Sequence, residues 1–119
     1  MVLCTLASVS CVIGAEPQKL FIRAGDSADI WYGFNVSGKV YYAVRTRDGS
    51  NQIDVWWIKW GFGQTANVGT IMGNGALDIP IGLSNFAISA KLRGRASSDT
   101  VVYISDAVQV AETVTFSFP

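Results

Sequence analysis

The chain has 119 residues, of which half are hydrophobic and 15% are charged, a composition that suits one compact domain and excludes a disordered chain. Nine basic and nine acidic side chains cancel and are scattered along the sequence, so the basic stripe that a nucleic-acid partner requires is missing. Histidine, the commonest general acid–base group and metal ligand, is absent. We therefore expect no nucleic-acid partner, no metal site and no cofactor.

The first fifteen residues form an apolar segment without charged side chains, MVLCTLASVSCVIGA, and the composition turns polar at Glu16. This segment resembles the hydrophobic part of a secretory signal peptide, with the small residue Ala15 in the final position. It is too short for a transmembrane helix. We expect residues 1–15 to be a signal peptide and residues 16–119 to be one β-sandwich domain that is secreted or held in the cell envelope. The alternative is that residues 2–13 form the first strand.

From Gln18 onward the sequence consists of short segments with β-type alternation, separated by residues that favour turns. The expected strands are residues 20–23, 27–36, 39–47, 52–62, 76–81, 86–93, 100–105 and 113–118. No segment keeps a helical period, so the chain is expected to be all-β. About eight short strands predict a two-layer antiparallel β-sandwich, with an immunoglobulin-like or a jelly-roll topology.

Residues 52–62 hold three of the four tryptophans and form the strand around which the others are expected to be arranged. The preceding residues 48–51, Asp-Gly-Ser-Asn, are a strong turn signal and predict a hairpin with residues 39–47. The hairpin would place Arg45 opposite Asp54 as a favourable cross-strand pair.

Alternation along these two strands separates a core face from a solvent face. The expected core face consists of Val40, Tyr42, Val44, Ile53, Val55 and Trp57. The opposite face contains the charged side chains and consists of Tyr41, Ala43, Arg45, Asp54, Trp56, Ile58 and Trp60.

Two other strands are assigned by the same rule. In residues 27–36, Trp31 has the mixed polar surroundings of the solvent face, whereas Tyr32 and Phe34 lie on the other face. In residues 86–93, the side chains expected to point inward are Phe86, Ile88, Ala90 and Leu92.

The solvent face carries a large aromatic surface. Each large aromatic side chain can bury ~150–250 Å², so Tyr41, Trp56 and Trp60 together exceed the few hundred Å² of apolar surface that a monomer usually leaves exposed. A ligand, a loop such as residues 63–75, or a second subunit is therefore expected to cover them. The residues predicted to bind a ligand are Trp31, Tyr41, Arg45, Asp54, Trp56 and Trp60.

The spacing of two tryptophans favours carbohydrate as the ligand. Trp56 and Trp60 lie four residues apart, ~13 Å along the strand, which suits the apolar faces of successive sugars. We therefore expect an exported binding module for carbohydrate or another cell-surface ligand, and not an enzyme, because no nucleophile–base pair can be assembled from the sequence. Two alternatives use the same face: a protein–protein interface of an adhesion, coat or other structural subunit, including a homo-oligomer, and a toxin-like contact with a membrane surface.

Removal of residues 1–15 should leave the melting temperature of the domain almost unchanged, because a signal peptide contributes no core strand. If these residues formed a buried strand, losing several large apolar side chains at ~1.5–3 kcal/mol each would approach the ~5–15 kcal/mol stability of a whole domain. Thermal melts of the full chain and of the 16–119 fragment test this, together with the intact mass of the protein from its native host. A fragment that does not fold would place residues 1–15 in the sheet.

Overall fold

The structure, a computed structural model, describes residues 17–61, 66–83, 86–110 and 116–119. The described part of the chain is all-β, with eight strands in two antiparallel sheets of four, as the sequence predicts. The expected signal peptide lies outside the described residues, and so do residues 113–115 of the last expected strand.

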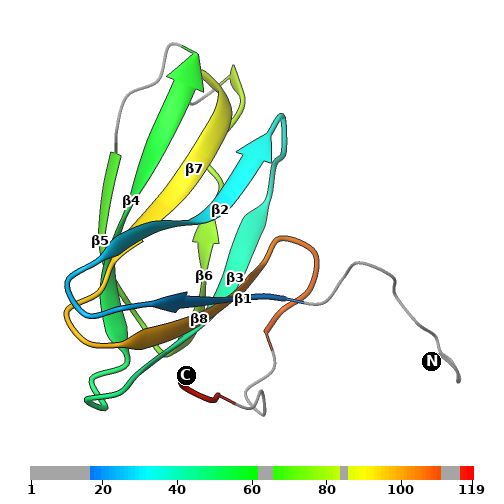
Figure 1. The fold of residues 1–119 in the computed structure, drawn as a ribbon. Helices are drawn as coiled ribbons and strands as arrows, with labels where there is room; N and C mark the ends of the chain where they lie inside the picture. Colours follow the sequence, from blue (N-terminus) through cyan, green and yellow to red (C-terminus); the bar gives the residue numbers. More distant parts are fainter. Residues whose placement is uncertain (1–16, 62–65, 84–85, 111–115) are drawn as a thin grey trace, which may run out of the picture.

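The strands are β1 (Gln18–Ile22), β2 (Ser27–Phe34), β3 (Lys39–Thr46), β4 (Gln52–Gly61), β5 (Ala66–Met72), β6 (Asn74–Asp78), β7 (Ala87–Arg95) and β8 (Thr100–Ser105). Sheet A has the order β1-β8-β3-β6, and sheet B has the order β2-β7-β4-β5 (Figure 1). Each early strand pairs with its counterpart counted from the other end: β1 with β8, β2 with β7, β3 with β6 and β4 with β5. This pairing of the first four strands with the last four, in reverse order and across two layers, is the jelly-roll topology and not the immunoglobulin-like one.

The predicted hairpin between residues 39–47 and 52–62 is wrong, because β3 belongs to sheet A and β4 to sheet B. The residues between them do form a tight turn: the Asp48 carboxylate accepts hydrogen bonds from the Thr46 hydroxyl at 2.6 Å and from the Ser50 backbone N–H at 3.0 Å. These contacts are local and do not determine whether the next strand joins the same sheet or crosses to the other. Here the chain crosses.

The core lies between the two sheets and is formed by inward side chains from both. All residues of the expected core face are buried: Val40, Tyr42, Val44, Ile53, Val55 and Trp57. This prediction is confirmed although the hairpin is wrong, because alternation along a strand does not depend on which strand lies beside it.

A β-bulge in β2 reverses the expected facing of its second half. Asp29 lies opposite Arg93, but Trp31 lies opposite Leu92, so Ile30 is the extra residue in β2. Ile30 and Trp31 therefore both point into the core, where Trp31 is only 8% exposed and meets the ring of Trp57 edge to face at 5.8 Å. The prediction that Trp31 lies on a solvent face is wrong for this reason.

The same bulge turns the next residues outward. Alternation alone predicts that Tyr32 and Phe34 lie on the same face as Ile30, opposite to Trp31. In the structure both are exposed to solvent. Gly33 points inward beneath Trp31, and a Cβ atom built on it would lie 2.2 Å from a ring carbon of that indole. The missing side chain thus makes room for the buried tryptophan.

A second irregularity shifts the start of β7. Trp60 of β4 lies opposite Ser89, but Gly61 lies opposite Ala87, which leaves Ile88 as the extra residue. Ala90 and Leu92 are fully buried, as predicted. Phe86 and Ile88 were expected inward but are exposed, because the alternation of β7 does not extend through the bulge.

The C-terminal residues 116–119 do not form the expected strand and instead lie against the outward side chains of sheet A. The Phe116 ring meets the Tyr103 ring edge to face at 5.0 Å, and the Arg45 guanidinium lies 4.7 Å from the centre of the Phe116 ring. The Arg47 guanidinium lies 4.7 Å from the Phe118 ring. The C-terminus therefore covers part of the outer face of sheet A with its own aromatic rings.

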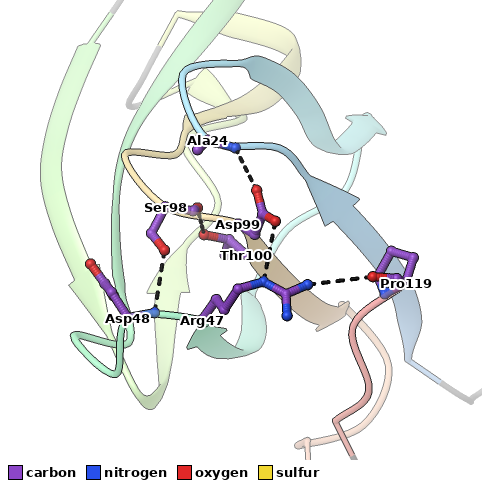
Figure 2. Close-up of polar contacts among 7 residues, drawn as sticks. All are labelled: Ala24, Arg47, Asp48, Ser98, Asp99, Thr100 and Pro119. Atoms are coloured by element: carbon purple, nitrogen blue, oxygen red, sulfur yellow. Dashed lines mark hydrogen bonds and ion pairs between the residues drawn. The ribbon is translucent and has the colours of Figure 1, made fainter.

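Polar contacts join the C-terminus to three turns at this end of the sandwich (Figure 2). Arg47 donates to an Asp99 carboxylate oxygen at 3.2 Å and to the Pro119 carbonyl at 3.4 Å, and Asp99 accepts from the Ala24 N–H at 3.0 Å. The Ala24 hydrogen bond, assisted by Arg47, lowers the pKa of Asp99 below that of an ordinary carboxyl. These charged groups are already paired, so we assign them to holding the fold together.

Replacing Gly33 with alanine should lower the free energy of unfolding by about 1–3 kcal/mol, because the new Cβ would collide with Trp31 while Trp57 holds that ring in place. Chemical denaturation measures the change. Ser27→Ala, at the exposed start of the same strand, is the control and should change stability by less than about 0.5 kcal/mol. Wild-type stability for Gly33→Ala would show that the indole is free to shift.

Candidate functional site

The outward side chains of sheet B form rows across β2, β7 and β4, which lie side by side in Figure 1. Taken from β2 to β4, the rows are Asp29, Arg93 and Trp56, then Tyr32, Lys91 and Ile58, and then Phe34, Ser89 and Trp60. The rows change from charged to aromatic along the strands. This face therefore presents apolar and ionic groups next to one another.

Three aromatic side chains are exposed at one end of this face. Tyr32 is 57% exposed, Phe34 is 62% exposed and Trp60 is 41% exposed. The centres of the Tyr32 and Trp60 rings are 6.3 Å apart and their planes meet at 62°, although their strands are separated by β7. Ser89, the small residue between Phe34 and Trp60, is buried. The Tyr32 and Trp60 rings thus meet over the central strand and leave ring surface facing solvent.

A three-membered ionic group lies next to the rings. The Asp29 carboxylate is 3.0 Å from Lys91 Nζ and 2.6 Å from a guanidinium nitrogen of Arg93. Lys91 Nζ also lies 5.4 Å from the centre of the Trp60 ring, within the range of a cation–π contact. Asp29 thus positions both cations, and Lys91 connects the ionic group to the aromatic end.

The ionic group affects the titration of Asp29. Partial burial acts to raise the pKa of this carboxyl, but the hydrogen bonds and positive charges of Lys91 and Arg93 outweigh it, so the pKa of Asp29 is lowered from its ordinary value of 3.8. The carboxylate is therefore ionised at neutral pH.

The structure divides the predicted ligand-binding residues among three places. Trp56, Trp60 and Asp54 lie on the outer face of sheet B, with Asp54 accepting a hydrogen bond from the Thr70 hydroxyl at 3.0 Å. Trp31 is in the core.

Tyr41 and Arg45 lie on the outward side of sheet A, on the opposite face of the sandwich. Arg45 donates to the Val44 carbonyl and to the Asn74 side chain, so its predicted pairing with Asp54 is wrong. The error follows from the hairpin, which would have joined both strands in one sheet.

The set of ligand-binding residues predicted from the sequence omits Tyr32, Phe34, Lys91 and Arg93, which belong to the aromatic and ionic rows of this face. The bulge at Ile30 reverses the facing of the first two, and nothing in the local sequence marks its position. Alternation in residues 86–93 places Lys91 outward but does not identify its neighbours, because its contact with Trp60 depends on the pairing of β7 with β4.

Comparison with known proteins does not identify this face: no protein-family model matches the chain, and searches of curated proteins and of solved structures give no significant match. Among the described residues, no group of three or more carboxylates or thiols is placed to hold a metal ion. The same residues include no helix with the length and apolar character needed to cross a membrane. Function must therefore be argued from the chemistry of the face.

Asp29→Asn should destabilise the protein most near neutral pH, by no more than about 1 kcal/mol because solvent screens this half-exposed group. The lowered pKa means that the ionised carboxylate stabilises the fold above its unfolded-state pKa and loses this effect as pH falls through the folded-state value. The difference in melting temperature from wild type should therefore fade between about pH 5 and about pH 2.

The matched control is Asp26→Asn, whose carboxylate makes no ion pair with a described residue. A difference between wild type and Asp29→Asn that stays constant over this pH range would contradict a stabilising role for the ionised group.

Proposed function

We propose that this chain is an exported, non-catalytic binding module that holds carbohydrate on the outer face of sheet B. The observation that carries the proposal is the exposure of Tyr32, Phe34 and Trp60 on one sheet face, directly beside the ionic group of Asp29. Export follows from the expected signal peptide and is part of the proposal.

The chemistry of the face suits a sugar. Flat aromatic rings bury the apolar C–H faces of pyranoses, whereas carboxylates and basic groups exchange hydrogen bonds with hydroxyls. Trp56 and Trp60 are four residues apart on β4, ~13 Å along the strand, so a glycan of several units can contact both. Lys91 lies on the neighbouring strand β7 and Asp29 on β2 beyond it, within reach of the same ligand.

A binding role is favoured over catalysis by the state of the carboxylates. Asp29 is paired with two cations and its pKa is lowered, so it does not retain the proton that a general acid must donate at neutral pH. Asp54 lies in a different row of the face and is bound by Thr70. These observations do not support glycoside hydrolysis, which uses one protonated and one ionised carboxyl group.

A protein–protein interface is the second candidate, and further exposed apolar side chains favour it. Ile88 is exposed in the β7 bulge, and Phe86 and Leu83 precede it, with Leu83 93% exposed. Together with Phe34 and Trp60 they enlarge the apolar surface at this end beyond what stacking on a sugar requires. A structural, adhesion or coat subunit that associates with a second copy would use this surface.

Trp60→Ala and Tyr32→Ala should each weaken glycan binding about tenfold or more, because losing ~60–100 Å² of buried apolar contact at ~25 cal/mol per Å² corresponds to ~1.5–2.5 kcal/mol. A glycan array and pull-down on insoluble polysaccharides identify the ligand, and titration calorimetry measures the affinities. Tyr41→Ala, which removes a ring from the opposite face of the sandwich, is the matched control and should bind like wild type.

Two outcomes would sink the carbohydrate proposal: retention of the folded protein by no glycan, or unchanged retention of both variants. Light scattering distinguishes the second candidate. A concentration-dependent dimer that Leu83→Ser or Ile88→Ser converts to a monomer, without any glycan binding, would establish the protein interface instead.

A further inference from the structure

The charged end of sheet B contains a cleft that the aromatic residues do not reach. It has a volume of about 330 Å³, within the range of small-ligand sites. Its lining comes from the β1–β2 turn, the start of β4, and the end of β7 with the two residues that follow it, and comprises Gly25, Gln52, Ile53, Asp54, Arg95, Ala96 and Ser97. Two backbone hydrogen bonds, from Gly25 N–H to the Ala96 carbonyl and from Ala96 N–H to the Asp26 carbonyl, join two of these walls. The cleft is thus built on paired backbone.

Arg95 differs from the other cations of the face. Lys91 and Arg93 are both bound to Asp29, whereas the Arg95 side chain makes no hydrogen bond or ion pair with any described residue. Its cross-strand neighbour Asp54 accepts a hydrogen bond from Thr70. The guanidinium of Arg95 therefore retains its planar set of N–H donors for a ligand.

The three consecutive outward side chains at the end of β7, Lys91, Arg93 and Arg95, are all cationic. Two carboxylates, Asp29 and Asp54, share the face with them, which leaves one positive charge in excess (three cations minus two carboxylates). The whole chain carries no net charge, so this local excess is specific to the face. It is complementary to a ligand that carries negative charge.

We propose that the cleft binds the carboxylate of an acidic sugar, so that the glycan lying along β4 and β7 is a uronic-acid polysaccharide. Arg95 would form the two-pronged pairing that guanidinium and carboxylate groups favour. The sugar hydroxyls would form hydrogen bonds with Asp54, Gln52 and Ser97. The presence of the Asp54 carboxylate in the same cleft fits a sugar acid, because hydroxyl groups can donate to Asp54, whereas a simple anion would be repelled by it.

The geometry connects this cleft to the aromatic end. Asp54 and Trp60 lie six residues apart on one strand, ~20 Å, with Trp56 between them on the same face. A polysaccharide can therefore place one sugar in the cleft and others over the rings. This inference rests on the proposed function, because it specifies the class of glycan that the same face would hold.

Matched pairs of glycans test the inference: polygalacturonate against its methyl ester, and glucuronate-substituted xylan against unsubstituted xylan. Wild-type protein should bind the acidic member about tenfold or more tightly, the gain expected from one charge-assisted hydrogen-bonded pair. Arg95→Gln should abolish this preference and leave the affinity for the neutral member unchanged. The variant should also melt like wild type, since the Arg95 side chain has no hydrogen bond or ion pair to lose among the described residues.

The matched control is Arg23→Gln, which removes the same charge from an exposed position in the β1–β2 connection. It should keep the preference for the acidic glycan. If Arg23→Gln and Arg95→Gln reduce the preference equally, the effect is long-range charge and the cleft proposal is overturned.

The remaining outcomes separate the two proposals. If wild type binds both members of each pair equally and Trp60→Ala weakens both, the cleft proposal fails and the carbohydrate proposal stands. If wild type binds no member of any pair or of the wider array, the carbohydrate proposal fails and the inference fails with it.

Discussion

The packing of Trp31 against Trp57 is the contact on which both the core and the outer face depend. One extra residue in β2, Ile30, is what brings Trp31 inward, and the same extra residue turns Tyr32 and Phe34 to the outside. Without the bulge, strict alternation would expose the tryptophan and bury the other two rings. One irregularity of the backbone therefore supplies a large side chain to the core and two rings to the candidate site.

The jelly-roll pairing brings the rest of the site together. β7 lies between β2 and β4, so its cations enter a face whose rings come from strands far earlier in the chain. In this order the aromatic side chains flank Lys91, and Asp29 can reach both Lys91 and Arg93. The ionic and aromatic parts of the face thus depend on the order of strands that are far apart in the sequence. No short sequence motif therefore predicts them.

Alternation predicts the facing of a side chain where the strand is regular and fails where a bulge interrupts it, as at Trp31 and Ile88. Predictions that rest on the identity of a partner strand fail for a separate reason. The inward positions of Val44 and Trp57 follow from alternation within one strand, so they hold although the two strands belong to different sheets. The predicted pair of Arg45 with Asp54 required a choice between a hairpin and a crossing, and turn residues satisfy both equally well. The facing of Trp31 depends on a bulge that the alternation of residues 27–36 does not reveal.

The two outer faces of the sandwich differ in whether other parts of the chain cover their aromatic side chains. On sheet A, residues 116–119 bring Phe116 against Tyr103 and hold it beneath Arg45. On sheet B, the expected covering loop is partly an edge strand, because residues 66–72 pair with β4 within the sheet. The rings of Tyr32 and Trp60 keep about half of their surface in solvent. Because burying such surface is favourable at ~25 cal/mol per Å², the uncovered face of sheet B is the one on which another molecule gains most by binding.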